Sequence, residues 1–109
     1  MAQEELRKRL PSVPRKISEI APEDIRVQIL ATVVDSKESI IVIDDGTAKI
    51  NVSFPQPQKT GPGNLVRVFG RVIPVENGFE LSGEILQDMG RLDLELARKV
   101  EEIEKRLGV

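Results

Sequence analysis

Alternating apolar and polar positions run through the middle of the chain and predict β-strands. The alternation covers residues 25–34, 40–43, 50–54, 65–73 and 79–85, and a period of two is typical of a strand with one buried face. Tight-turn residues follow residue 43 (Asp44-Asp45-Gly46-Thr47) and residue 73 (Pro74-Val75-Glu76-Asn77-Gly78). A Pro- and Gly-rich stretch at residues 55–63 cannot pair as a strand. We therefore expect five short strands joined by turns and one long connection.

The alternation also predicts which side chains face inward. In residues 25–34 the inward positions are Ile25, Val27, Ile29, Ala31 and Val33. In residues 65–73 the valines face inward, and Gly70 among them predicts a bend or bulge. The outward positions of that segment are Arg67, Phe69 and Arg71, and the same parity places Phe54 and Phe79 on buried faces.

Both ends of the chain have helical spacing. Residues 3–10, with Leu6 and Leu10 four apart, predict a short helical lead. Near the C-terminus Asp93 is a candidate N-cap for an amphipathic helix, whose opposite face pairs Glu with Lys or Arg at favourable spacing. Its apolar stripe consists of Leu92, Leu96, Val100, Ile103 and Leu107. We expect a lead over residues 1–15, a barrel over 16–90 and an oligomerisation helix over 91–109.

Two uses of that stripe are open. The helix could plug the open end of its own barrel, or it could bind a partner. The stripe has more large apolar positions than a short plug needs, which favours partner binding.

Composition narrows the chemistry. The 109 residues include no Cys and no His, which excludes a thiol nucleophile, a Ser-His-Asp triad and a zinc site built on thiolate or imidazole. The formal net charge of −2 argues against a nucleic-acid-binding surface that is basic throughout, although a local basic strip can coexist with this net charge. No apolar run is long enough to span a membrane, and the N-terminus lacks a signal-peptide core, so a cytoplasmic protein is expected. We also expect no cofactor.

The adjacent carboxylates Asp44 and Asp45 have two interpretations. They could form a metal or acid–base site, or they could shape the turn that ends at Gly46. The turn is favoured, because Asp accepts local amide hydrogen bonds, Gly tolerates positive φ, and no third ligand lies nearby in the sequence. We expect no enzymatic activity.

Three sequence blocks carry a family resemblance: Ile43-Asp44-Asp45-Gly46-Thr47, Val68-Phe69-Gly70-Arg71-Val72, and Ile85-Leu86-Gln87-Asp88-Met89 with the helix after it. Over roughly residues 16 to 107 the chain resembles the single-OB subunits of replication protein A, most closely the small subunit in its archaeal form. The resemblance implies an all-β, five-stranded OB-fold Greek-key barrel followed by a C-terminal amphipathic helix. It also implies a structural subunit of a heterotrimeric single-stranded-DNA-binding complex in DNA replication, repair and recombination. In that family the helix joins two larger OB-fold subunits in a three-helix bundle, and the largest subunit does most of the DNA binding.

On this basis the candidate nucleic-acid contacts are outward residues of the barrel: Arg26, Lys37, Lys49, Asn51, Ser53, Arg67, Phe69 and Arg71. The candidate partner contacts are the five stripe residues. DNA-binding members of the family carry aromatic residues where the third strand ends and in the last hairpin, whereas this chain has Pro55 and Val75 there. Direct binding to single-stranded DNA is therefore expected to be weak.

Two alternatives are open. Arg67, Phe69 and Arg71 could be a strip that contacts DNA, or a platform on which the N-terminal segment or a partner packs. The whole chain could instead be an independent OB-fold module that binds single-stranded DNA or RNA, or an OB partner of the telomere-capping type.

Overall fold

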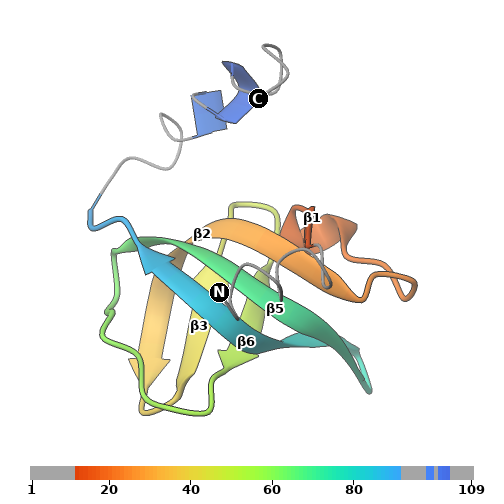
Figure 1. Ribbon diagram of the computed structural model, residues 1–109, viewed down its shortest axis with the longest axis horizontal. Coiled ribbons are helices and arrows are strands. Elements are labelled where there is room, and N and C mark those ends of the chain that lie inside the picture. Colours follow the sequence, from red (N-terminus) through yellow and green to blue (C-terminus); the bar gives the residue numbers. More distant parts are fainter. Residues whose placement is uncertain (1–11, 92–97, 100, 104–109) are drawn as a thin grey trace, which may run out of the picture.

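A barrel of five strands forms the body of the molecule (Figure 1). The computed structural model describes residues 12–91, 98–99 and 101–103. Its elements, in chain order, are β1 (Val13–Pro14), the 3-10 helix η1 (Ile17–Glu19), β2 (Arg26–Lys37), β3 (Ile40–Asp44), β4 (Lys49–Ser53), β5 (Leu65–Val75) and β6 (Gly78–Asp88).

The barrel closes because β2 pairs with two strands. The strand order is β2-β3-β4-β6-β5, and β5 pairs back onto β2. β2 pairs with β5 through residues 26–32 and with β3 through residues 32–37, and a register shift between Val33 and Asp35 lies where it passes between them. β4 and β6 are parallel, and the other pairs of barrel strands are antiparallel. This topology confirms the expected all-β OB-fold barrel.

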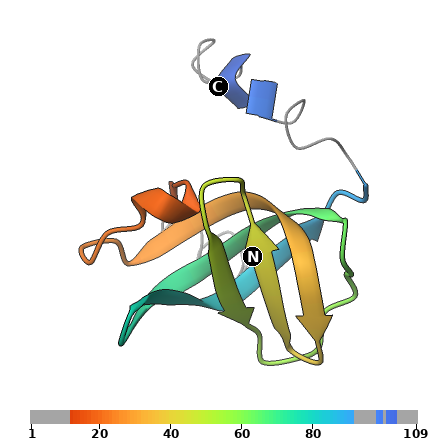
Figure 2. The ribbon, with the colours of Figure 1, turned by 180° about the vertical axis from the view of Figure 1, so that it is seen from behind.

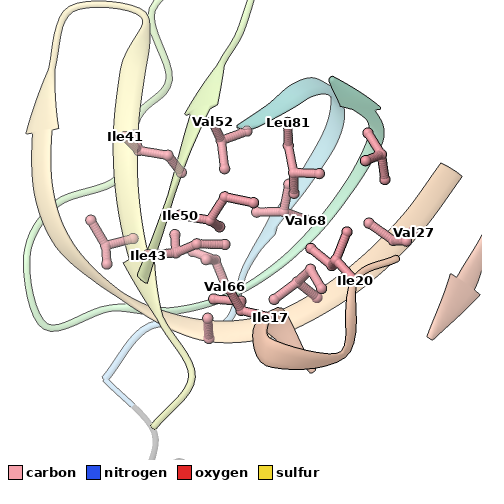
Figure 3. Packing of buried hydrophobic residues seen from close by; sticks show 14 of the residues in the cluster. Ile17, Ile20, Val27, Ile41, Ile43, Ile50, Val52, Val66, Val68 and Leu81 are labelled. Atoms are coloured by element: carbon pink, nitrogen blue, oxygen red, sulfur yellow. The ribbon is translucent and has the colours of Figure 1, made fainter. Parts of the chain in front are cut away.

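The inward residues form an aliphatic core. Ile29, Ile41 and Val52 are fully buried, and Figure 3 shows side chains from β2 to β6 meeting inside the barrel. β-Branched side chains suit both the pleated strand and this narrow interior. Full burial of one such side chain stabilises the fold by about 1.5–3 kcal/mol before entropy is counted.

Two glycines allow close packing in the barrel, and the sequence predicted a bend or bulge at one of them, Gly70. The register of β5 and β6 shifts between Phe69 and Gly70, as expected. A Cβ atom at Gly70 would lie 2.7 Å from the carbonyl oxygen of Ser82. On β6, the ring of Phe54 packs directly over Gly83, so a side chain there would collide with it.

The sequence did not predict a short cap, formed by β1 and η1, that precedes the barrel. β1 pairs in parallel with Val27 and Gln28, and η1 follows it. Ile17 and Ile20 are buried, and Figure 3 shows both side chains reaching into the core. These two isoleucines belong to the core cluster, and the backbone amide of Ile17 donates to Asp45 at the β3–β4 turn.

Some expected boundaries were wrong. Ile25, expected on the buried face, is 68% exposed, because β2 begins one residue later and Ile25 lies in the short segment between the turn at Pro22 and Glu23 and that strand. Residues 35–37, expected in a loop, continue β2, since the bulge beside Val33 restores pairing with β3. Strand β6 also runs on, to Asp88.

The two expected terminal helices fall largely outside the described residues. The lead expected at residues 3–10 lies outside them. Of the residues expected to form the C-terminal amphipathic helix, Arg98, Lys99 and Glu101 to Ile103 are described and are helical, and the amphipathic helix as a whole stays a prediction. Among the described residues no helix is long and apolar enough to cross a membrane.

Candidate nucleic-acid interface

The cross-strand register brings four of the predicted contact residues into one row on the outer surface. Each member lies opposite the next on the neighbouring strand, so the row crosses the strands from β2 through β5, β6, β4 and β3 and returns to β2. In order, the row is Arg26, Arg71, Ser82, Ser53, Ile40 and Lys37. We call it the transverse row.

The transverse row faces solvent. Its members are exposed except for the half-buried Arg26, whereas their neighbours along the strands, such as Val52 and Leu81, are buried. At a spacing of ~4.8 Å between strands, the five steps of the row cover roughly 24 Å around the barrel. Figure 1 looks onto β5 and β6, and Figure 2 looks onto β3 and β4 from behind, so the row passes from one view into the other.

The first end of the row is cationic. Arg26 and Arg71 lie directly opposite each other on β2 and β5, and like charges in that position repel. Arg26 is paired with Glu84, its Nε lying 3.1 Å from a carboxylate oxygen. Within the described residues Arg71 has no ion pair and is exposed. The Arg26–Glu84 pair offsets that repulsion, which leaves Arg71 as the unpaired guanidinium at this end of the row among the described residues.

The centre and the far end of the row complete a simple pattern. Ser53 and Ser82 place two small hydroxyl-bearing residues side by side across β4 and β6. Ile40 is 49% exposed and offers an apolar surface, and Lys37 beside it adds a second cationic end. The row therefore provides charge at its ends, hydrogen-bonding groups in the middle and apolar surface beside Lys37.

Lys49 and Asn51 lie on the same exposed face of β4 but outside the row. Lys49 is opposite Asp44, and the side-chain amide of Asn51 donates to Glu80 at 3.5 Å. These carboxylates offset the positive charge of Lys49, so this part of the face is polar without being basic.

Arg67 and Phe69 lie on the same outward face of β5 as Arg71 but outside the transverse row. Phe69 is half-buried, between Gln28 on β2 and Ile85 on β6. The Gln28 side chain donates to Ser12 at 3.4 Å, and Arg67 is paired with Glu101 at 3.3 Å. Arg67, Phe69 and Arg71 therefore lie at successive outward positions of β5, as predicted, and of the three Arg71 belongs to the transverse row. Whether Phe69 contacts DNA or serves as a packing platform stays a prediction to test.

Aromatic side chains are absent from the transverse row. The chain has three phenylalanines. Phe54 is buried, Phe79 packs half-buried against the core, and Phe69 lies on the β2–β5 surface. Base stacking on an aromatic ring, worth ~1–3 kcal/mol per base in single-strand binders, is therefore not available along the row.

Asp45 is a buried polar residue with a second role, beyond the turn, that the sequence analysis did not predict. It is 1% exposed, and its carboxylate accepts hydrogen bonds from the backbone amides of Ile17 at 2.8 Å and Thr47 at 2.9 Å and from the Thr47 hydroxyl. Burial raises the pKa of Asp45, but the hydrogen bonds from Thr47, Ile17 and Ala48 outweigh it and hold the pKa below its ordinary value. Asp45 shapes the turn, as expected, and its hydrogen bond from the Ile17 amide also holds η1 against that turn.

The C-terminal stretch approaches the barrel beside this turn. Arg98 lies 4.0 Å from the Asp45 carboxylate, and Glu101 pairs with Arg67. A polar hollow of about 360 Å³ lies between the stretch and the barrel. Of the predicted partner residues, Ile103 is described and is 55% exposed, and the other four, Leu92, Leu96, Val100 and Leu107, lie outside the described residues.

Within the part of the chain that the structure describes, no group of three or more Asp, Glu, His or Cys side chains is placed to hold a metal ion.

Comparison with known proteins identifies the fold. No family model and no curated protein matches the sequence. Among solved structures, a chain of the S. pombe Stn1-Ten1 complex matches with a TM-score of 0.59 and 18% identity, over 77% of this chain and 71% of that chain. The hypothetical protein YgiW of E. coli matches with a TM-score of 0.54 and 17% identity, over 72% of this chain and 89% of that chain. Together with the closed five-stranded topology, these similarities define an OB-fold protein.

Proposed function

We propose that the chain is an OB-fold module that binds single-stranded nucleic acid weakly through the transverse row and works with partner subunits. The observation that carries the proposal is the row itself, because it places Arg26 and Arg71 at one end and Lys37 at the other around hydroxyl-bearing residues. Phosphates can be neutralised at both ends without sequence readout. The likeness to a chain solved as part of the Stn1-Ten1 complex supports a role in an assembly of the telomere-capping type.

The proposed activity is binding and not catalysis. The two carboxylates that could suggest acid–base chemistry, Asp44 and Asp45, accept hydrogen bonds from backbone amides of their own turn. Asp45 is additionally engaged by the amide of Ile17. Their geometry supports a structural role.

Charge reversal in the row tests the proposal. We expect Lys37→Glu combined with Arg71→Glu to weaken binding of a fluorescent single-stranded oligonucleotide by about tenfold or more at low salt, because both ends of the row lose phosphate contacts. The matched control is Lys59→Glu with Lys99→Glu, which changes the net charge equally at exposed positions outside the row. Equal losses in both variants would show that total charge alone governs binding and would contradict the proposal.

A second candidate is a small subunit of a replication protein A-like heterotrimer. The favouring observation is Ile103, a large apolar side chain that is 55% exposed on a helical stretch. In this proposal the stripe Leu92, Leu96, Val100, Ile103 and Leu107 joins two larger OB-fold subunits in a helix bundle.

Affinity purification of the tagged chain from its native cells, with mass spectrometry of co-eluting chains, tests this candidate. We expect two larger OB-fold proteins to co-purify, and Ile103→Glu to remove them, because an unpaired charge is costly inside an apolar seam. Lys99→Glu, on the same stretch, is the control and should retain them. Recovery of the chain alone would rule out the heterotrimer.

A further inference from the structure

The C-terminal helical stretch contacts its own barrel through charged side chains. Arg98 approaches the buried carboxylate of Asp45 at 4.0 Å, and Glu101 pairs with Arg67 at 3.3 Å. The two contacts reach different parts of the barrel, since Asp45 lies in the turn after β3 and Arg67 lies on β5. In both views the stretch stands apart from the barrel ribbon, so these long side chains bridge the space between them (Figures 1 and 2).

The hollow beneath the stretch is charged on both sides. The stretch lines it with Arg98, Glu101 and Glu102, and the barrel and its cap line it with charged residues of both signs, including Arg15, Lys16, Glu19, Asp45 and Arg67. Ile103 is not among the lining residues and is 55% exposed. On a helix, positions 101 and 103 lie about 200° apart, so the side that carries Glu101 is nearly opposite the side that carries Ile103.

We propose that Arg98, Lys99 and Glu101 to Ile103 form an electrostatic strap that docks reversibly on the barrel. The ion pairs Arg98–Asp45 and Arg67–Glu101 set its orientation and keep Ile103 turned away from the barrel. The Arg67–Glu101 pair is partly exposed on both sides, and a pair of this kind shifts an equilibrium by about fivefold at most. In the Arg98–Asp45 pair the carboxylate is buried, but the Arg98 side chain is partly exposed and the contact is long, at 4.0 Å. The docked strap is therefore held loosely, and a partner can engage its apolar side without first breaking an apolar contact within the chain.

The absence of cysteine in the sequence allows site-specific labelling. Spin labels at Ser18→Cys and Lys99→Cys, two exposed positions on η1 and on the strap, report their separation by pulsed electron resonance. At low salt we expect a dominant short-distance population. Raising the salt to about 1 M shortens the screening length to ~3 Å, so this population should fall several-fold. A distance distribution that does not change with salt would overturn the proposal.

Charge reversal identifies the contact that holds the strap. We expect Glu101→Arg to reduce the short-distance population several-fold by placing two guanidinium groups together, and the added change Arg67→Glu to restore it. Glu76→Arg is the matched control, with the same charge change at an exposed position in the β5–β6 turn, away from the hollow. A loss that the second change does not restore, or an equal loss in the control, would show that this pair does not hold the strap. The readout needs neither nucleic acid nor a partner, so its result is independent of both proposed functions.

Discussion

At the scale of single residues, Asp45 links parts of the chain that are distant in sequence. Its carboxylate binds the amide of Ile17, which is 28 positions earlier, while it also accepts from Thr47 two positions later. Nearly all of the side chain is buried, so each hydrogen bond is made without competition from water. The residue therefore couples the cap to the hairpin.

Replacing Asp45 with Asn tests this coupling and its pH dependence. The Asn side chain has one acceptor oxygen in place of two, so the backbone N–H of either Ile17 or Thr47 loses its buried acceptor. We therefore expect the free energy of unfolding at neutral pH to fall by about 1–3 kcal/mol. The pKa of Asp45 is lowered in the fold from an ordinary value of 3.8. Its charged form therefore stabilises the fold above that pH, and this contribution is lost as the pH falls through the lower folded value. The difference between wild type and variant should shrink on acidification below 3.8, as measured by urea unfolding.

The same substitution one residue earlier is the control. Asp44 accepts the amide of Gly46 at 2.7 Å in an exposed position, so Asp44→Asn should cost much less. Asp24 and Asp88 also have lowered pKa values, mainly through hydrogen bonds from the amides of Ala21 and Gly90, and they contribute acid sensitivity to both variants equally. Equal destabilisation by Asn at positions 44 and 45 would contradict the assigned role of Asp45.

Gly70 gives a second prediction at this scale. A Cβ atom at Gly70 would lie 2.7 Å from the Ser82 carbonyl oxygen, and a backbone atom cannot rotate away as a side chain can. We expect Gly70→Ala to lower the free energy of unfolding by about 1–3 kcal/mol. Gly61→Ala, with no atom within 4 Å of the new methyl group, should be neutral or slightly stabilising. Calorimetry of the two variants checks both, and a neutral Gly70→Ala would show that the strands can move apart.

At the scale of elements, the strands were predictable because each carries its own alternation, as Val66, Val68 and Val72 show. The cap was not. β1 has two residues and η1 has three, too few to show a period, and they are held by contacts with β2 and Asp45. The continuation of β2 to Lys37 was hidden for a related reason, since the bulge at Val33 interrupts the alternation that defines the strand.

The cap should nevertheless contribute to stability as a core element does. Ile20 is 8% exposed and packs in the main cluster, so we expect Ile20→Ala to lower the free energy of unfolding by about 2–5 kcal/mol. Ile25→Ala is the control, because the same side chain five positions later is 68% exposed. Chemical denaturation of both variants makes the comparison. Similar small losses would mean that η1 adds little to the barrel.

At the scale of the whole molecule, the sequence predicted which candidate contact residues face outward. It could not predict which of them lie next to one another on the barrel surface. Strand parity correctly turned Ser53 and Arg71 outward. Their relation depends on the register between β5, β6 and β4, which joins residues far apart in the chain. Only that register shows that Arg71 shares a row with Lys37 and that Arg67 instead pairs with the C-terminal stretch.

The arrangement predicts how binding depends on salt. Because Arg26 is paired with Glu84, Lys37 and Arg71 are the cations of the transverse row that can neutralise phosphates, and each phosphate neutralised on a single strand contributes a slope of about −0.7 to the plot of log affinity against log salt. With about two phosphates, the slope should be roughly −1.4, and the affinity should fall by about sevenfold between roughly 50 and 200 mM salt. Anisotropy titrations with a fluorescent oligonucleotide at several salt concentrations measure this slope. Arg71→Gln should bring it about 0.7 closer to zero, since one contact is lost without adding a negative charge. Tight binding that changes little with salt would instead require stacking, and Phe69→Ala would then be the variant that abolishes it.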